Sequence, residues 1–217
     1  MINLKIAIQK SGRLNEDSLT LLKECGISIN NGKDQLMAQA SNFRLDVLYL
    51  RNSDIPQYVR DGVADIAIIG DNTEKEKKTG IRHVLDLGFS RCRLSIAVPK
   101  NVDFQDISYL QGKKIATSYP NSLKDFLTEN DIEAEIHEIS GSVEIAPNIG
   151  LADAICDLVS SGSTLFKNGL KEVYKIFESQ AILVANSGLC GEKQELLAQL
   201  VFRIKAVLAA NTTNIFY

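Results

Sequence analysis

The sequence predicts an α/β protein with mainly parallel sheets, divided into two lobes. Short apolar strands alternate with helical segments along most of the 217 residues, an order typical of βαβ units. This strand–helix pattern also occurs twice, which indicates an internal repeat. Because 45% of the residues are hydrophobic, the chain can bury a sizeable core, and we do not expect it to be disordered.

Each half of the sequence begins with a strand, a loop and a helix. In the first half, apolar residues 5–8 lead through the loop 9–13 into a helix over 15–25. In the second half, strand residues 114–117 lead through 118–121 into another helix. Both helices carry apolar residues at helical spacing, so each has one face that packs on a sheet.

Each half then continues with a second strand and a helix that ends in glycine. Residues 45–50 form a strand, followed by a helix over 53–62 with a serine N-cap and a glycine stop. Residues 134–139 and 142–150 repeat that plan. The two glycines lie 88 residues apart, and each opens a Gly-x-Ala-Asp sequence that enters a strand. We expect both aspartates, Asp65 and Asp153, to act as turn residues.

Two βαβαβ halves predict two lobes. We expect residues 1–93 with 186–217 to form lobe I and residues 94–185 to form lobe II, with the final helix at 192–208 packed on lobe I. This plan is that of the type II periplasmic-binding-protein-like architecture, in which a ligand lies in a cleft between the lobes. The loops that follow the strands of each lobe face such a cleft.

Composition excludes several classes of function. The formal net charge of −3, from 24 basic and 27 acidic residues that are interspersed, gives no footprint for nucleic acid. There is no apolar run of the roughly 20 residues that span a bilayer, and the N-terminus enters a strand directly, so we expect a cytoplasmic protein without a membrane segment. The four cysteines form no CxxC pair and the two histidines lie in no ligand motif, so we expect no metal site built by the protein alone.

A loop rich in hydroxyl groups carries the clearest chemical signal. It follows the strand 154–159 and contains Ser160, Ser161, Gly162, Ser163 and Thr164. Small hydroxyl residues around a glycine let backbone N–H and side-chain O–H groups converge on a phosphate at the start of a helix. Asp157, at the end of the strand, can accept hydrogen bonds from two sugar hydroxyls. The combination predicts a grip for ribose 5-phosphate, although a loop of this composition alone more commonly forms a turn that caps the next helix.

The residues around this loop decide between the two interpretations. They match, without exception, the signature of the ATP phosphoribosyltransferases at Glu144, Gly150, Ala152, Ile155, Asp157, Leu158, Ser161, Gly162, Thr164 and Leu165. The resemblance covers essentially the whole chain and includes the segments 9–14, 54–56, 62–65, 68–70, 92–95 and 116–120. The sequence therefore resembles the catalytic core of this family.

The resemblance is to the long form of the enzyme, which carries a C-terminal regulatory domain that binds histidine. The sequence ends at residues 214–217, about where that domain would begin, so we expect the domain to be absent. Two explanations stay open, a chain cut to its catalytic part and a natural short form that relies on a separate regulatory subunit. The loop Gln-Lys-Ser-Gly-Arg at 9–13 favours the first, because the short form usually has Pro-Lys-Gly-Arg.

The resemblance implies a reaction between ATP and phosphoribosyl pyrophosphate at the first step of histidine biosynthesis. N1 of adenine attacks the anomeric carbon and pyrophosphate leaves, so the enzyme mainly positions the reactants and stabilises negative charge. We expect Mg2+ shared by the substrate phosphates, with Lys10 and Arg13 as catalytic cations on the loop after the first strand. The family also suggests a homodimer of the core, and a higher oligomer where the regulatory domain is present.

Five further residues are weaker candidates for the ATP site: Arg51, Asp71, Arg93, Tyr119 and Glu144. For Tyr119, stacking on a base and packing ahead of a rigid proline are equally good interpretations. Two rival functions are a solute-binding protein, which the two-lobed plan alone allows, and an inactive regulatory paralogue. The expected lack of an export signal and the hydroxyl loop argue against the first. The intact Lys10, Arg13 and hydroxyl loop argue against the second.

Overall fold

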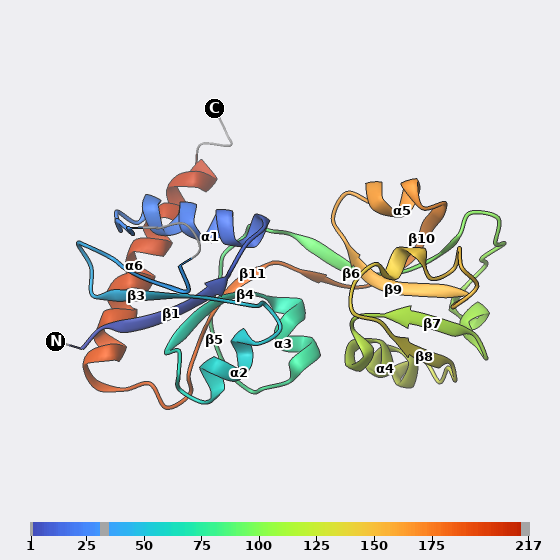
Figure 1. Cartoon of the computed structure of the whole chain (residues 1–217), viewed down its shortest axis with the longest axis horizontal. Helices are drawn as coiled ribbons and strands as arrows, with labels where there is room; N and C mark the ends of the chain where they lie inside the picture. Colours follow the sequence, from blue (N-terminus) through green and yellow to red (C-terminus); the bar gives the residue numbers. More distant parts are fainter. Residues whose placement is uncertain (1, 31–34, 214–217) are drawn as a thin grey trace. The chain divides into compact units, whose positions relative to one another are not determined.

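The computed structural model describes residues 2–30 and 35–213, so the chain end at 214–217 lies outside the described residues. The chain forms two compact units (Figure 1): unit 1 comprises residues 1–90 and 180–217, and unit 2 comprises residues 91–179. The chain passes between the units at 90/91 and 179/180, whereas we expected lobe boundaries at 93/94 and 185/186. The main difference is the strand at 181–185, which we assigned to lobe II and which pairs within the sheet of unit 1.

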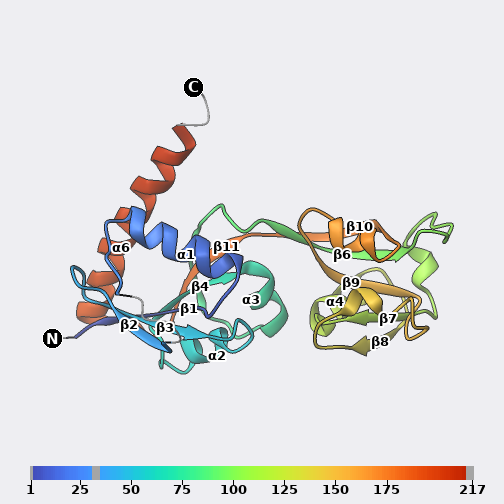
Figure 2. The same ribbon diagram turned by 45° about the horizontal axis from the view of Figure 1, so that its top comes forward.

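The sheet of unit 1 has the order β2-β3-β1-β4-β11-β5. Its strands are β1 (Leu4–Gln9), β2 (Met37–Gln39), β3 (Leu45–Leu50), β4 (Ile66–Gly70), β5 (Arg82–Asp86) and β11 (Ala181–Ala185). The helices are α1 (Arg13–Glu24), α2 (Ile55–Arg60), α3 (Asp71–Lys77) and α6 (Gly191–Thr213). Figure 2 shows α1 and α6 together on one side of this sheet and α2 on the other.

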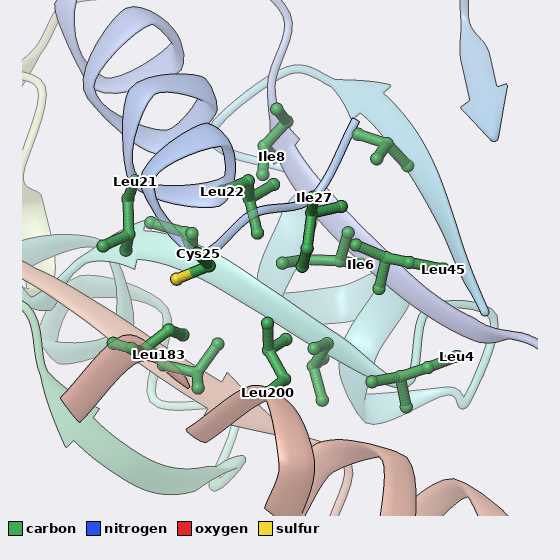
Figure 3. Close-up of a cluster of buried hydrophobic side chains, with 14 of the residues drawn as sticks. Leu4, Ile6, Ile8, Leu21, Leu22, Cys25, Ile27, Leu45, Leu183 and Leu200 are labelled. Carbon is green, nitrogen blue, oxygen red and sulfur yellow. The ribbon is translucent and has the colours of Figure 1, made fainter. Parts of the chain in front are cut away.

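Alternation along β1 explains this layering. Leu4, Ile6 and Ile8 are buried on the face that α1 and α6 cover, whereas Ala7 faces α2, as the two-residue period of a strand requires. Figure 3 shows Leu22 of α1 and Leu200 of α6 meeting the side chains of β1. Both leucines are fully buried, so this face holds the main core of unit 1.

The sheet of unit 2 has the order β10-β6-β9-β7-β8. Its strands are β6 (Cys92–Pro99), β7 (Lys114–Thr117), β8 (Glu135–Glu138), β9 (Ala154–Val159) and β10 (Leu170–Ser179). Helix α4 (Pro120–Glu129) covers one face. The 3-10 turn η2 (Val143–Ile145) and the short helix α5 (Ser163–Lys167) cover the other, and the 3-10 turn η1 (Ile107–Leu110) precedes β7.

The repeat predicted from the sequence is present in both sheets. In unit 1, β1 pairs in parallel with β3 and β4; in unit 2, β7 pairs in parallel with β8 and β9. The expectation of mainly parallel sheets is wrong, because antiparallel strands extend each core. Strand β11 joins β4 and β5 antiparallel, and β6 joins β9 and β10 antiparallel, so both sheets are mixed.

The two Gly-x-Ala-Asp turns make the same contacts. Asp65 accepts a hydrogen bond from the backbone N–H of Lys5 at 2.8 Å, and its own N–H donates to the Lys5 carbonyl. Asp153 does the same with Lys114, at 2.9 Å. Each aspartate thus fixes the start of the neighbouring parallel strand, which confirms the expectation that both are turn residues.

The helix expected over 142–150 is wrong. The structure has only the single turn η2 there, followed by a turn in which the N–H of Gly150 donates to the Pro147 carbonyl. A proline inside a helix removes a donor and disfavours helical backbone in the residue before it. Helix α2 tolerates Pro56 because that proline lies in its first turn, and its N-cap is Asp54, not the expected Ser53.

Candidate active site

The loop after β9 leaves a group of backbone donors free. Gly162 has φ 78° and ψ 0°, a left-handed conformation that favours glycine. It ends the loop and starts α5, where the N–H of Phe166 donates to its carbonyl at 3.0 Å. Within the described part of the chain, no hydrogen bond uses the N–H groups of Ser161, Gly162, Thr164 or Leu165.

Hydroxyl groups surround these donors. Ser161, Ser163 and Thr164 are exposed, and the hydroxyls of Ser161 and Ser163 lie 3.0 Å apart. The buried side chain of Leu165 anchors the turn to the sheet. Since α5 has only five residues, its macrodipole is small, and local N–H and O–H groups supply most of any attraction for an anion. The loop can therefore bind a phosphate-sized anion.

Asp157 lies on β9 just before this loop, and its charge is destabilised. Burial raises the pKa of its carboxyl group to about 6. A hydrogen bond from the N–H of Leu158, at 2.8 Å, opposes this rise, and the neighbouring charge of Glu144 adds to it. Glu144 comes from η2, which packs against β9. The structure thus brings two predicted carboxylates together.

Arg93 is engaged by protein groups and has a different environment from the one expected for an ATP ligand. Its Nε and Nη2 atoms donate to the two carboxylate oxygens of Glu172, each at 2.6 Å. Its Nη1 atom donates to the carbonyl of Ser160 at 3.0 Å. Ser95 donates to the same carboxylate at 2.7 Å. The guanidinium group therefore links β6 and β10 to the hydroxyl loop.

The sequence reasoning missed Glu172 and Ser95. A signal existed for Ser95, because Arg93 and Ser95 alternate with apolar residues in β6, which puts two polar groups on one face of a central strand. For Glu172 the signal is weak, since it lies 79 residues from Arg93 on a strand that we did not predict.

The loop after β1 presents the two predicted cations of unit 1. Gly12 has φ 88° and ψ −177°, again a glycine conformation, and the side chains of Gln9 and Asn15 brace the loop through backbone carbonyls. Lys10 is exposed, and its ammonium group has no partner among the described residues. Arg13, whose side chain is 71% exposed, lies 3.7 Å from Asp17.

Of the remaining candidates, Arg51 and Asp71 belong to unit 1 and Tyr119 belongs to unit 2. Arg51 is exposed directly after β3. Asp71 starts α3 and forms an ion pair with Lys75 at 2.5 Å. Tyr119 is partly buried against the core beside α4, and its N–H donates to the Thr117 hydroxyl at 2.8 Å. This packing agrees with the structural interpretation of Tyr119.

The described residues form neither a cluster of metal ligands nor a helix that could span a membrane. No three His, Cys, Asp or Glu side chains gather there as metal ligands. Within residues 2–30 and 35–213, no helix has both the length and the apolar character needed to cross a bilayer.

Comparison with solved structures supports the architecture. A chain of the ATP phosphoribosyl transferase (HisG:HisZ) complex from Thermotoga maritima superposes with a TM-score of 0.82 at 29% identity, covering 95% of this chain and 99% of that one. The substrate-binding protein of an amino acid ABC transporter superposes with a TM-score of 0.63 at 12% identity, covering 96% and 94%. These matches confirm the predicted two-part, periplasmic-binding-protein-like α/β fold.

Comparison of sequences gives the family. The family model HisG, described as ATP phosphoribosyltransferase, matches residues 51–206. An ATP phosphoribosyltransferase of Cytophaga hutchinsonii is 59% identical over 211 residues, which cover 97% of this chain and 74% of the relative. One of Phocaeicola vulgatus is 53% identical over 207 residues, covering 95% and 73%. The chain therefore belongs to the ATP phosphoribosyltransferase family.

Proposed function

We propose that the loop after β9 binds the 5-phosphate of phosphoribosyl pyrophosphate in the reaction of this family. That reaction transfers the phosphoribosyl group to N1 of the adenine of ATP, releases pyrophosphate and opens histidine biosynthesis. One observation carries the assignment: the loop around Gly162 combines unpartnered N–H groups with exposed hydroxyls. A phosphate dianion satisfies several such donors at once.

The two carboxylates beside the loop suit the ribose ring. Ionised Asp157 and Glu144 are acceptors only, and ribose presents two neighbouring hydroxyl donors. Each hydrogen bond to a hydroxyl stabilises the charged form of the carboxylate, so substrate binding relieves the cost of burying Asp157. The same negative charges stabilise the positive charge that develops on the sugar as the bond to pyrophosphate breaks.

Lys10 and Arg13 are the proposed ligands of the leaving pyrophosphate and the phosphates of ATP. Both are exposed; Lys10 lies on the loop after β1, and Arg13 is the first residue of α1. The ion pair between Arg13 and Asp17 is long and exposed, so it contributes little stability and can be replaced by a phosphate contact. Arg51 and Asp71 follow β3 and β4, the two strands that flank β1, and are proposed as further contacts to ATP.

Mg2+ is the proposed counter-ion of the substrate phosphates. The donor set fits a metal that arrives with the substrate: the described residues form no cluster of three ligands, but the Asp157–Glu144 pair is a local negative charge that favours a nearby cation. When bound, Mg2+ supplies neutralisation of the departing pyrophosphate. Adenine N1 already holds a lone pair, so the side chains need only orient it towards the anomeric carbon.

The proposed setting is the cytoplasm, with a homodimer of this core as the basic assembly. The Thermotoga maritima relative is described as a HisG:HisZ complex, so a regulatory subunit or a regulatory domain is a candidate partner of this chain. A higher oligomer is expected where such a domain is present.

Replacement of one hydroxyl tests the phosphate site. We expect Thr164→Ala to weaken phosphoribosyl pyrophosphate binding about tenfold, because one hydrogen bond to a charged group is lost. Isothermal calorimetry with ribose 5-phosphate and with phosphoribosyl pyrophosphate measures it. Thr128→Ala on α4 is the matched control, since its hydroxyl donates only to the Lys124 carbonyl. Equal affinities in the two variants would place the phosphate elsewhere.

A further inference from the structure

A row of polar side chains crosses the sheet of unit 2 on the face of the hydroxyl loop. Arg93 and Ser95 are alternate residues of β6, and Asp157 is the register partner of Ser95 on β9. Glu172 approaches from β10, on the other side of β6. Its carboxylate accepts three hydrogen bonds of 2.6–2.7 Å, two from Arg93 and one from Ser95. Arg93, Ser95 and Glu172 are therefore joined by hydrogen bonds, and Asp157 lies next to Ser95 in the register.

The charge of Arg93 is satisfied within the protein. The hydrogen bonds to Glu172 raise the pKa of Arg93, and those from Arg93 lower the pKa of Glu172. A bidentate pair of this kind fixes the plane of the guanidinium group. The remaining edge, at Nη1, points to the carbonyl of Ser160. Arg93 is thus oriented towards the first peptide of the loop.

We propose that Arg93 and Glu172 act as positioning residues that set the hydroxyl loop for phosphate. The C=O and N–H of a trans peptide point in opposite directions because the peptide is planar. When Nη1 of Arg93 holds the Ser160 carbonyl, the N–H of Ser161 is directed away from Arg93. That N–H has no partner among the described residues, so it joins the N–H groups of Gly162 and Thr164 as a donor for the substrate.

This inference rests on the proposed phosphate role of the loop. It replaces the expected direct contact between Arg93 and ATP, and the two roles predict opposite effects of removing Glu172. If Glu172 orients Arg93, its loss lets the Ser160 peptide rotate and weakens phosphate binding. If Arg93 contacts a substrate directly, loss of Glu172 releases a cation and leaves binding equal or tighter.

Glu172→Gln in the full chain is the deciding variant. We expect the KM for phosphoribosyl pyrophosphate to rise about tenfold, in line with the loss of one charge-assisted hydrogen bond, while the KM for ATP changes less than about twofold. Glu178→Gln is the matched control: Glu178 lies on the same strand, opposite Arg93 in register, but its carboxylate accepts a hydrogen bond from Lys175 at 2.6 Å. We expect Glu178→Gln to leave both constants unchanged.

A second variant and a binding measurement complete the test. Arg93→Lys keeps the charge and loses the fork, so it should weaken ribose 5-phosphate binding, measured by calorimetry, as much as Glu172→Gln does. Two results for Glu172→Gln would overturn the positioning role. One is a fall in kcat while the KM for phosphoribosyl pyrophosphate and the KM for ATP both stay at their values in the unmodified protein. The other is tighter phosphate binding. If Thr164→Ala weakens binding and Glu172→Gln does not, the loop remains the phosphate site and the positioning role of Arg93 and Glu172 is wrong. If neither variant weakens it, the phosphate site itself is misassigned.

Discussion

Units 1 and 2 share a scaffold and differ in their loops. Both place a first strand between two parallel neighbours, β3-β1-β4 and β8-β7-β9, and extend the third strand with an antiparallel one. In unit 1 the proposed phosphate ligands, Lys10 and Arg13, are exposed and follow the first strand of the repeat, β1. In unit 2 the exposed hydroxyls follow the third strand of the repeat, β9, and the partly buried carboxylate of Asp157 lies on that strand itself. The two units thus share a framework of strands, and the candidate site residues follow a different strand of that framework in each unit.

The same division is visible in the two turn aspartates. Asp65 is 5% exposed and, besides the backbone of Lys5, accepts from the ammonium group of Lys193 at 2.7 Å. Asp153 is exposed and makes only the equivalent backbone contact to Lys114. Asp65 therefore also links α6 to the sheet of unit 1. Among the described residues, Asp153 makes no equivalent contact to a helix.

The largest expected effect is the difference in stability between alanine variants of these two aspartates. Asp65→Ala leaves the backbone N–H of Lys5 and the ammonium of Lys193 without their buried partner, and we expect a loss of about 3 kcal/mol in the free energy of unfolding. For Asp153→Ala we expect about 1 kcal/mol, because water replaces the lost acceptor. Urea denaturation at neutral pH measures both. Equal losses would mean that the ion pair to α6 adds nothing.

A smaller effect is expected for Asp157 of unit 2, in the pH dependence of the free energy of unfolding. The pKa of Asp157 is raised to about 6 from an ordinary 3.8, so the folded state binds more protons than the unfolded state between these values. The contribution of Asp157 to the free energy of unfolding is therefore fully present below about pH 4, and it is lost as the pH rises through about 6. Asp157→Asn removes this penalty, and we expect it to stabilise the protein by about 2 kcal/mol at pH 8 and by nothing at pH 4.

Thermal unfolding of both proteins across this pH range measures the difference. The same variant should bind phosphoribosyl pyrophosphate more weakly, because the amide accepts fewer hydrogen bonds than the carboxylate. A stabilised variant with unchanged affinity would separate the burial of Asp157 from any part in binding.

Sequence predicted the repeated framework well because its signals are local. The Gly-x-Ala-Asp turns at 62–65 and 150–153 fix a glycine conformation and a side-chain acceptor within four residues, and the structure has both. The apolar strand 181–185 was recognised but assigned to the wrong unit. All five of its residues are buried, so its composition fits either sheet, and only pairing with β4 and β5 decides.

Sequence reasoning missed strand β10, and with it the partner of Arg93. Strand β10 carries register shifts between Glu172 and Tyr174 and between Lys175 and Phe177, and each shift breaks the two-residue alternation that marks a strand. Glu172 lies on β10, so the pairing of Glu172 with Arg93 could not be predicted from the segment 92–95, which gave only the prediction of an ATP contact for Arg93. The hydroxyl loop could be found because its donors and its glycine lie within five consecutive residues.

Amide chemical shifts show whether the phosphate binds unit 2 at the loop 160–164. Ribose 5-phosphate titrated into 15N-labelled protein should move the amide signals of Ser161, Gly162 and Thr164 most, while those of residues 9–13 in unit 1 stay in place. If the signals of residues 9–13 move instead, or those of neither segment move, the phosphate does not bind at the loop 160–164.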